Sequence, residues 1–111
     1  MAYDEKLADQ IRDQFKRERN ITEKKMFGGL CFMMNGNMIC GVEKDNLVVR
    51  VGLNQYDWAL KQKHTRPMDF TGRPLKGFVY VLPRGFKTPS SLTKWLDLAT
   101  DFVRSLPSKL N

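Results

Sequence analysis

The chain has 111 residues and a net charge of +7, and its length is that of one domain, so we expect residues 1–111 to form a single folded unit. No apolar run approaches the roughly 18 residues that a membrane span needs, and the charged N-terminal stretch lacks the apolar segment of a signal peptide. These features argue against a membrane protein and predict a cytoplasmic one with reduced cysteines.

Apolar residues recur every four positions near the N-terminus. This spacing is typical of a helix that lays one apolar face on a sheet while its charged side chains face water. The recurring residues are Tyr3, Leu7, Ile11 and Phe15. We expect a helix over residues 3–18.

The stretch from Lys25 to Gly52 has the pattern of a three-stranded antiparallel meander. Asn35-Gly36 is a strong hairpin signal because both residues tolerate positive φ, and residues 44–46 supply polar turn chemistry before a second β-branched run. Gly28-Gly29 interrupts the first strand, which predicts a bulge or the close approach of another backbone, that of the first or the third helix. A phosphate-binding loop is disfavoured, since no lysine-serine ending or helix follows these glycines.

The two cysteines flank the predicted Asn35-Gly36 turn. If these two residues are the centre of the turn, Cys31 and Cys40 are direct cross-strand partners, with Cα atoms about 4.5 Å apart, at the short end of the range for a disulfide. The pair is therefore either two buried small hydrophobes, which a reducing compartment favours, or a redox-responsive pair. A zinc site is disfavoured, because two sulfurs and the distant His64 cannot supply four ligands.

A short helix and a second hairpin should follow the meander. The helix is expected over residues 53–62, and its apolar face consists of Leu53, Tyr56, Ala59 and Leu60. The hairpin should comprise a short strand over 68–70, a loop over 71–77 and a strand over 78–82. His64 has no serine, cysteine or carboxylate motif beside it, so we interpret it as a loop histidine.

The C-terminal segment predicts a third helix over residues 91–105, with Ser90 or Ser91 as its N-terminal cap. Its apolar stripe is the richest in the chain, which makes it the expected principal packing partner of the sheet. The stripe consists of Leu92, Trp95, Leu96, Ala99, Phe102, Val103 and Leu106.

Together these elements predict an α+β fold: a two-layer sandwich of a five-stranded antiparallel sheet with helices on one face, in the order α-β-β-β-α-β-β-α. No combination of residues amounts to a catalytic site. The sequence therefore predicts a non-enzymatic protein with no cofactor and no metal.

Most of the positive charge is concentrated in one segment. Residues 61–87 contain seven Lys/Arg and one Asp/Glu, which predicts a basic patch. Such a patch, interleaved with Phe78, Tyr80 and Phe86, can contact an acidic protein or nucleic acid. Alternatively, its charges only protect an exposed hairpin from edge-to-edge pairing. The candidate residues are Arg66, Arg73, Lys76, Arg84 and Lys87.

Three segments, KKMFGGLCFMMNGNMICGV, VRVG and RPMDFTGRPLKGFVYV, resemble the N-terminal domain of the TfoX/Sxy family, and the similarity runs through nearly the whole chain. The resemblance implies a cytosolic bacterial protein with a two-layer α+β fold. Founding members of the family regulate or coactivate competence genes and carry a second, C-terminal domain. Because the chain stops at Asn111, we expect a stand-alone member. The resemblance carries over no catalytic residues.

The leading interpretation is therefore a regulatory or interaction module, linked to transcriptional regulation of competence. Its partner would be a regulatory protein or nucleic acid, contacted through the basic hairpin. The alternative is a thiol redox responder that uses Cys31 and Cys40.

Overall fold

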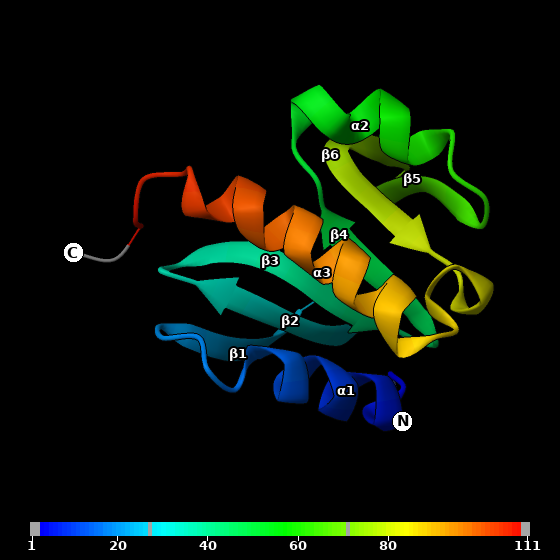
Figure 1. Ribbon diagram of the computed structural model, residues 1–111. Helices are drawn as coiled ribbons and strands as arrows, with labels where there is room; N and C mark the ends of the chain where they lie inside the picture. Colours follow the sequence, from blue (N-terminus) through cyan, green and yellow to red (C-terminus); the bar gives the residue numbers. More distant parts are fainter. Residues whose placement is uncertain (1–2, 27, 71, 110–111) are drawn as a thin grey trace.

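The computed structural model describes residues 3–26, 28–70 and 72–109, which form one six-stranded antiparallel sheet and three α-helices (Figure 1). The strand order across the sheet is β1-β2-β3-β4-β6-β5. In chain order the elements are α1 (Glu5–Phe15), β1 (Ile21–Met26), β2 (Gly29–Met34), β3 (Asn37–Glu43), β4 (Asn46–Arg50), α2 (Leu53–Leu60), β5 (Thr65–Phe70), β6 (Arg73–Val81), the short 3₁₀ helix η1 (Pro83–Phe86) and α3 (Pro89–Arg104).

All three helices pack on the same face of the sheet. One apolar core joins side chains of α1, α2 and α3 to those of the strands, and α1 and α3 lie side by side in front of the sheet in Figure 1. Its largest fully buried members include Leu7, Ile11, Phe32, Ile39 and Leu96. The predicted α+β class with helices on one face is confirmed. No helix within the described residues is both long and apolar enough to span a membrane.

The sheet has six strands where the sequence predicted five, because β1 was missed. Residues 22–25 of β1 are exposed, so this edge strand lacks the apolar alternation by which strands are recognised. It is held instead by its ladder with β2 and by Arg12 of α1, whose guanidinium donates two hydrogen bonds of 2.7 Å to the Glu23 carboxylate. The predicted first strand of the meander is therefore two strands.

Gly28-Gly29 lies at the reversal between β1 and β2, where Met26 pairs with Gly29, so the predicted bulge is wrong. Gly28 has a φ of 75°, which glycine adopts without strain. The predicted close approach is present at Gly29, but it is to β3 and not to a helix. A Cβ at Gly29 would lie 2.1 Å from the carbonyl oxygen of Val42, so no side chain fits there.

A β-bulge overturns the predicted pairing of the cysteines. Next to the Asn35-Gly36 turn the ladder follows the prediction, with Met33 opposite Met38. The register then shifts between Phe32 and Met33, so that Phe32 faces Cys40 and Cys31 faces Gly41. One extra residue on a strand changes every pairing beyond it.

α1 and α3 begin and end one to three residues from their predicted limits, whereas α2 begins at Leu53 as predicted and ends two residues early. Asp4 caps α1, since its carboxylate accepts from the backbone N–H groups of Lys6 and Leu7. Thr88, and not Ser90 or Ser91, caps α3, where it forms a capping box with Ser91.

The apolar face predicted for α2 is partly wrong. Ala59 is buried and Tyr56 and Leu60 are half-buried against the core, but Leu53 is 69% exposed. The first residue of α2 therefore projects away from the sheet.

The second hairpin is longer than predicted. β6 begins at Arg73, so residues 73–77 belong to a strand and not to a loop, and β5 begins at Thr65. Thr71, the first residue of the predicted loop, lies outside the described residues. This hairpin forms the end of the sheet that α2 covers.

The sheet face away from the helices carries a second, smaller apolar cluster. Val48, Met68 and Tyr80 are buried there, with Phe78 packed against them. At the C-terminal end of β4, the guanidinium of Arg50 lies 5.2 Å from the ring centroid of Phe78 and 5.6 Å from that of Phe102. Partial burial lowers the pKa of Arg50. These contacts tie α3 to the far side of the sheet.

Candidate functional site

The basic residues predicted from the sequence do not form one patch. Arg73 and Lys76 lie toward the start of β6, whereas Arg84 lies in η1 and Lys87 directly follows it, beyond the other end of that strand. At about 3.3 Å per strand residue, β6 spans roughly 26 Å from Arg73 to Val81, and Arg84 lies beyond its far end. The predicted surface is therefore split into a hairpin pair (Arg73 and Lys76) and a group beyond β6.

Arg66 belongs to neither group. It lies on the edge strand β5, and its guanidinium carbon is 5.4 Å from the ring centroid of its cross-strand neighbour Tyr80. Pro67 follows it and cannot donate to a further strand. A charge and a proline on an edge strand fit the alternative that Arg66 protects this edge from pairing with another strand.

Arg84 lines an open cleft of about 800 Å³ between the C-terminal end of α2, the turn at residues 61–64, η1 and α3. We call it the Trp58 cleft. Its volume falls in the range of about 300–1,000 Å³ typical of ligand sites. Its lining includes Trp58, Lys61, Lys63, Arg84, Lys94 and Trp95.

The turn after α2 forms one wall of the Trp58 cleft. The Thr65 hydroxyl lies 2.9 Å from the carbonyl oxygen of Ala59 and 2.8 Å from that of Gln62. It thereby provides a hydrogen-bond donor for the carbonyl groups at the C-terminal end of α2, which have no partner within the helix. His64 adopts a φ of 65°, which turns the chain into β5. Lys61 and Lys63 are thereby held exposed at the rim.

A tryptophan and a glycine position the opposite wall. The indole N–H of Trp95 donates to the carbonyl oxygen of Gly85, 3.2 Å away, and joins α3 to η1. A Cβ at Gly85 would lie 2.5 Å from Cγ1 of Val81, so only glycine allows η1 to lie this close to β6. These contacts fix the backbone that carries Arg84.

Trp58 is the aromatic residue that the cleft leaves open. Trp58 is 45% exposed, whereas Trp95 is 8% exposed. The two ring centroids are 6.0 Å apart at an interplanar angle of 50°. In the described part of the chain, Leu53 and Trp58 are the large apolar side chains that are exposed, and only Trp58 lines the cleft.

The charge around the cleft is strongly positive. Lys61, Lys63, Arg84 and Lys94 line it together with one carboxylate, Asp101. Among the residues that the structure describes, ion pairs are made by Arg12, Lys16 and Arg104, so the four cations of the cleft have no carboxylate within salt-bridge distance. The cleft can therefore attract an anion without first breaking an internal ion pair.

The cleft contains two further titratable side chains, His64 and Asp101. His64 comes from the turn after α2, and Asp101 comes from α3. Within residues 3–26, 28–70 and 72–109, no three His, Cys, Asp or Glu side chains are grouped so as to hold a metal ion.

The cysteines lie away from the cleft and on opposite faces of the sheet. Cys40 belongs to the main core, while Cys31 alternates with Phe32 along β2 and faces the opposite side of the sheet. Both are free and buried, and burial raises the pKa of both thiols. The direct cross-strand pair on which the redox alternative depends is therefore absent.

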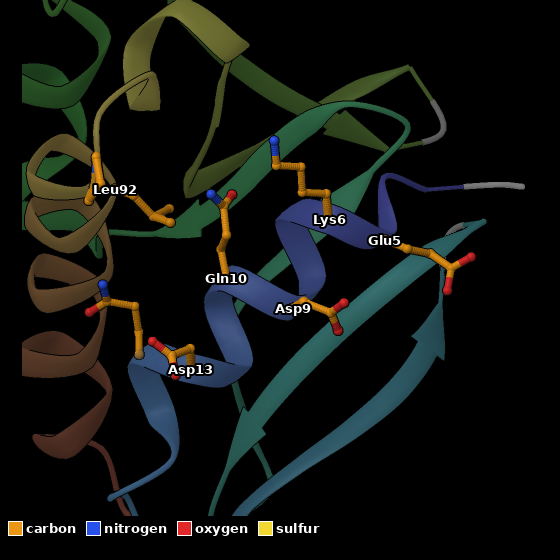
Figure 2. A pocket seen from close by; sticks show the side chains of 8 residues that line it. Glu5, Lys6, Asp9, Gln10, Asp13 and Leu92 are labelled. Atoms are coloured by element: carbon orange, nitrogen blue, oxygen red, sulfur yellow. The ribbon is translucent and has the colours of Figure 1, made fainter.

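A second hollow, of about 630 Å³, lies between α1 and the start of α3 (Figure 2). Glu5, Asp9 and Asp13 line it along α1, with Leu92 on the side of α3. Figure 2 shows Glu5, Asp9 and Asp13 along α1 and Leu92 on the neighbouring helix. Their charge is opposite to that of the Trp58 cleft, so the two hollows suit ligands of opposite sign.

The sequence interpretation found Arg84 but missed the other residues of the cleft. One signal was available: Trp58 does not fall on the apolar stripe predicted for its helix, and a large aromatic residue on a polar helix face marks a potential contact. Lys94 carried no such signal, because one lysine on the exposed face of a helix is ordinary. Only the packing of α3 beside η1 brings it to the cleft.

The fold and the site define a small α+β domain with helices on one sheet face and a cationic, aromatic cleft at one end. The family model of the TfoX N-terminal domain matches residues 13–103, most of the chain, and the chain belongs to this family. A search of curated proteins and a search of solved structures found no match. Membership of this family indicates a regulatory or interaction role.

Proposed function

We propose that this single domain is a non-enzymatic, cytoplasmic regulatory module that binds a polyanionic partner, and that the Trp58 cleft is the principal contact. The observation that carries the proposal is the set of four exposed cations around one hollow, without an ion pair among the described residues. Cations left without partners on a native surface create a potential that attracts acidic proteins or nucleic acids. Control of competence genes is the specific form that this role takes in the founding members of the family.

The hairpin pair is the second contact in this proposal. Arg73 and Lys76 are exposed on β6, and an extended partner that leaves the cleft can follow the sheet edge to reach them. They lack the hollow and the exposed aromatic ring that distinguish the cleft. We therefore assign them a supporting role.

The test measures binding of labelled duplex DNA, single-stranded DNA and polyglutamate at a series of salt concentrations. At least one of these polyanions should bind, with an affinity that falls steeply as salt rises. Lys61→Gln with Arg84→Gln should reduce the slope of log affinity against log salt by about 1.4 to 1.8 for nucleic acid, since each phosphate contact contributes about 0.7 to 0.9.

Arg73→Gln with Lys76→Gln is the matched control, because it removes the same charge from the other end of β6. It should reduce the slope less than the cleft substitutions do. A larger effect from the hairpin pair would move the principal site there. Absence of binding to all three polyanions at low salt would reject the proposed function.

A further inference from the structure

We propose that the Trp58 cleft binds single-stranded nucleic acid, with an unpaired base stacked on Trp58 and the phosphates of the strand held by the surrounding cations. The inference rests on the proposed polyanion-binding function and names its ligand. It depends on the combination of an exposed ring and unpaired cations within one hollow.

The first observation is the state of the Trp58 ring. Trp58 is 45% exposed, although burying an aromatic side chain is favourable. The ring of Trp95 packs against that of Trp58, with centroids 6.0 Å apart. This contact restrains the Trp58 side chain while part of it stays accessible. A base that stacks on such a ring contributes about 1–3 kcal/mol of binding free energy.

The second observation is the distribution of charge. Lys61 and Lys63 lie on the wall that contains Trp58, and Arg84 and Lys94 lie on the walls formed by η1 and α3. A phosphate backbone that passes a base onto the ring therefore meets cations on both sides. This arrangement of a stacking ring within a positive groove is the one by which proteins bind single strands.

Other polyanions use only part of this site. A duplex keeps the faces of its bases stacked inside, so it can contact the lysines and the arginine but not the tryptophan ring. An acidic peptide neutralises the same cations and has no base to place on Trp58. Single-stranded nucleic acid is the ligand class that uses both features.

Two uncharged polar side chains of the cleft, Gln62 and Ser91, are already engaged within the protein. The side-chain amide of Gln62 donates to the carbonyl oxygen of Trp58 at 3.0 Å, and the hydroxyl of Ser91 donates to that of Thr88 at 2.8 Å. Donors engaged within the protein are not free to read the edges of a base. Binding should therefore depend on stacking and charge more than on base identity.

The experiment compares the affinity of the whole domain for a labelled oligothymidine, a labelled oligoadenine, a duplex formed from the two, and polyglutamate at equal salt. Both single strands should bind at least about tenfold more tightly than the duplex, by the stacking energy of about one base. Trp58→Leu keeps an apolar side chain and removes the aromatic face. It should weaken single-strand binding by about 5- to 150-fold and leave duplex binding and the salt slope unchanged.

Leu53→Ala is the matched control, since Leu53 is the other exposed apolar residue of α2 and does not line the cleft. It should leave all affinities unchanged, and circular dichroism should show that both variants remain folded. Equal or tighter binding of the duplex or of polyglutamate would overturn the inference. So would a Trp58→Leu variant with unchanged affinity while Lys61→Gln with Arg84→Gln weakens binding, a result that rejects stacking and retains the polyanion-binding function.

Discussion

Trp95 joins the core of the domain to the wall of the cleft, and its removal should be among the most damaging single changes in the chain. The residue is 8% exposed and belongs to the main core, and its indole N–H donates to the carbonyl oxygen of Gly85 at 3.2 Å. Replacement of a buried tryptophan by alanine costs about 3–5 kcal/mol, through lost burial and the cavity left behind. Trp95→Ala should lower the free energy of unfolding by this amount.

Two further variants separate the contribution of the hydrogen bond to Gly85 from that of burying the aromatic ring. Trp95→Phe keeps an aromatic ring in the core but removes the donor to Gly85, and loss of one such hydrogen bond costs about 0.5–1.5 kcal/mol. Trp58→Ala removes a ring of the same size that is 45% exposed, so it should cost clearly less than Trp95→Ala. Trp95→Ala should therefore be the most destabilising of the three variants, and Trp95→Phe and Trp58→Ala should each cost clearly less.

Urea unfolding followed by far-ultraviolet circular dichroism measures these differences, because that signal does not depend on the tryptophans that are replaced. The midpoints should shift while the denaturant slope stays constant, as expected for a change in stability alone. A cost of Trp95→Ala below about 1 kcal/mol would show that the ring does not fill the core and that the described packing of α3 is wrong.

Three other predictions follow from the strands. Gly29→Ala should destabilise the domain by at least about 2 kcal/mol, because its Cβ would meet a backbone carbonyl, whereas Gly28→Ala should cost about 1 kcal/mol for its positive φ alone; equal costs in urea unfolding would contradict the described approach of β2 to β3. Burial and a hydrogen bond to Glu43 raise the pKa of Tyr80 to about 12, and a phenol in the unfolded chain titrates near 10. The folded state thus binds this proton more tightly, so the free energy of unfolding should fall between about pH 10 and pH 12, and Tyr80→Phe should remove that part of the decline. Cys31 and Cys40 should remain two free thiols after mild oxidation and alkylation of the folded protein; an intact mass lower by two hydrogens would restore the redox-responsive pair.

The sequence by itself determined the local features of this protein. The stripes of α1 and α3 are visible because a helix repeats every 3.6 residues whatever it packs against. The Asn35-Gly36 turn is visible because its two residues must adopt positive φ, and they do, at 52° and 82°. These are properties of neighbouring residues, and they carried the prediction of an α+β domain with helices on one face.

The tertiary structure decided what depends on partners distant in the chain. The polar strand β1 exists because β2 offers it a ladder, and its own residues give no apolar pattern to reveal it. The bulge that separates Cys31 from Cys40 comes from how β2 and β3 fit together beyond their turn, which turn chemistry alone does not set. The Trp58 cleft likewise forms where α2, η1 and α3 converge on one end of the sheet. A cleft has no signature in any one segment, because its shape and charge arise only when packing brings side chains from separate elements together.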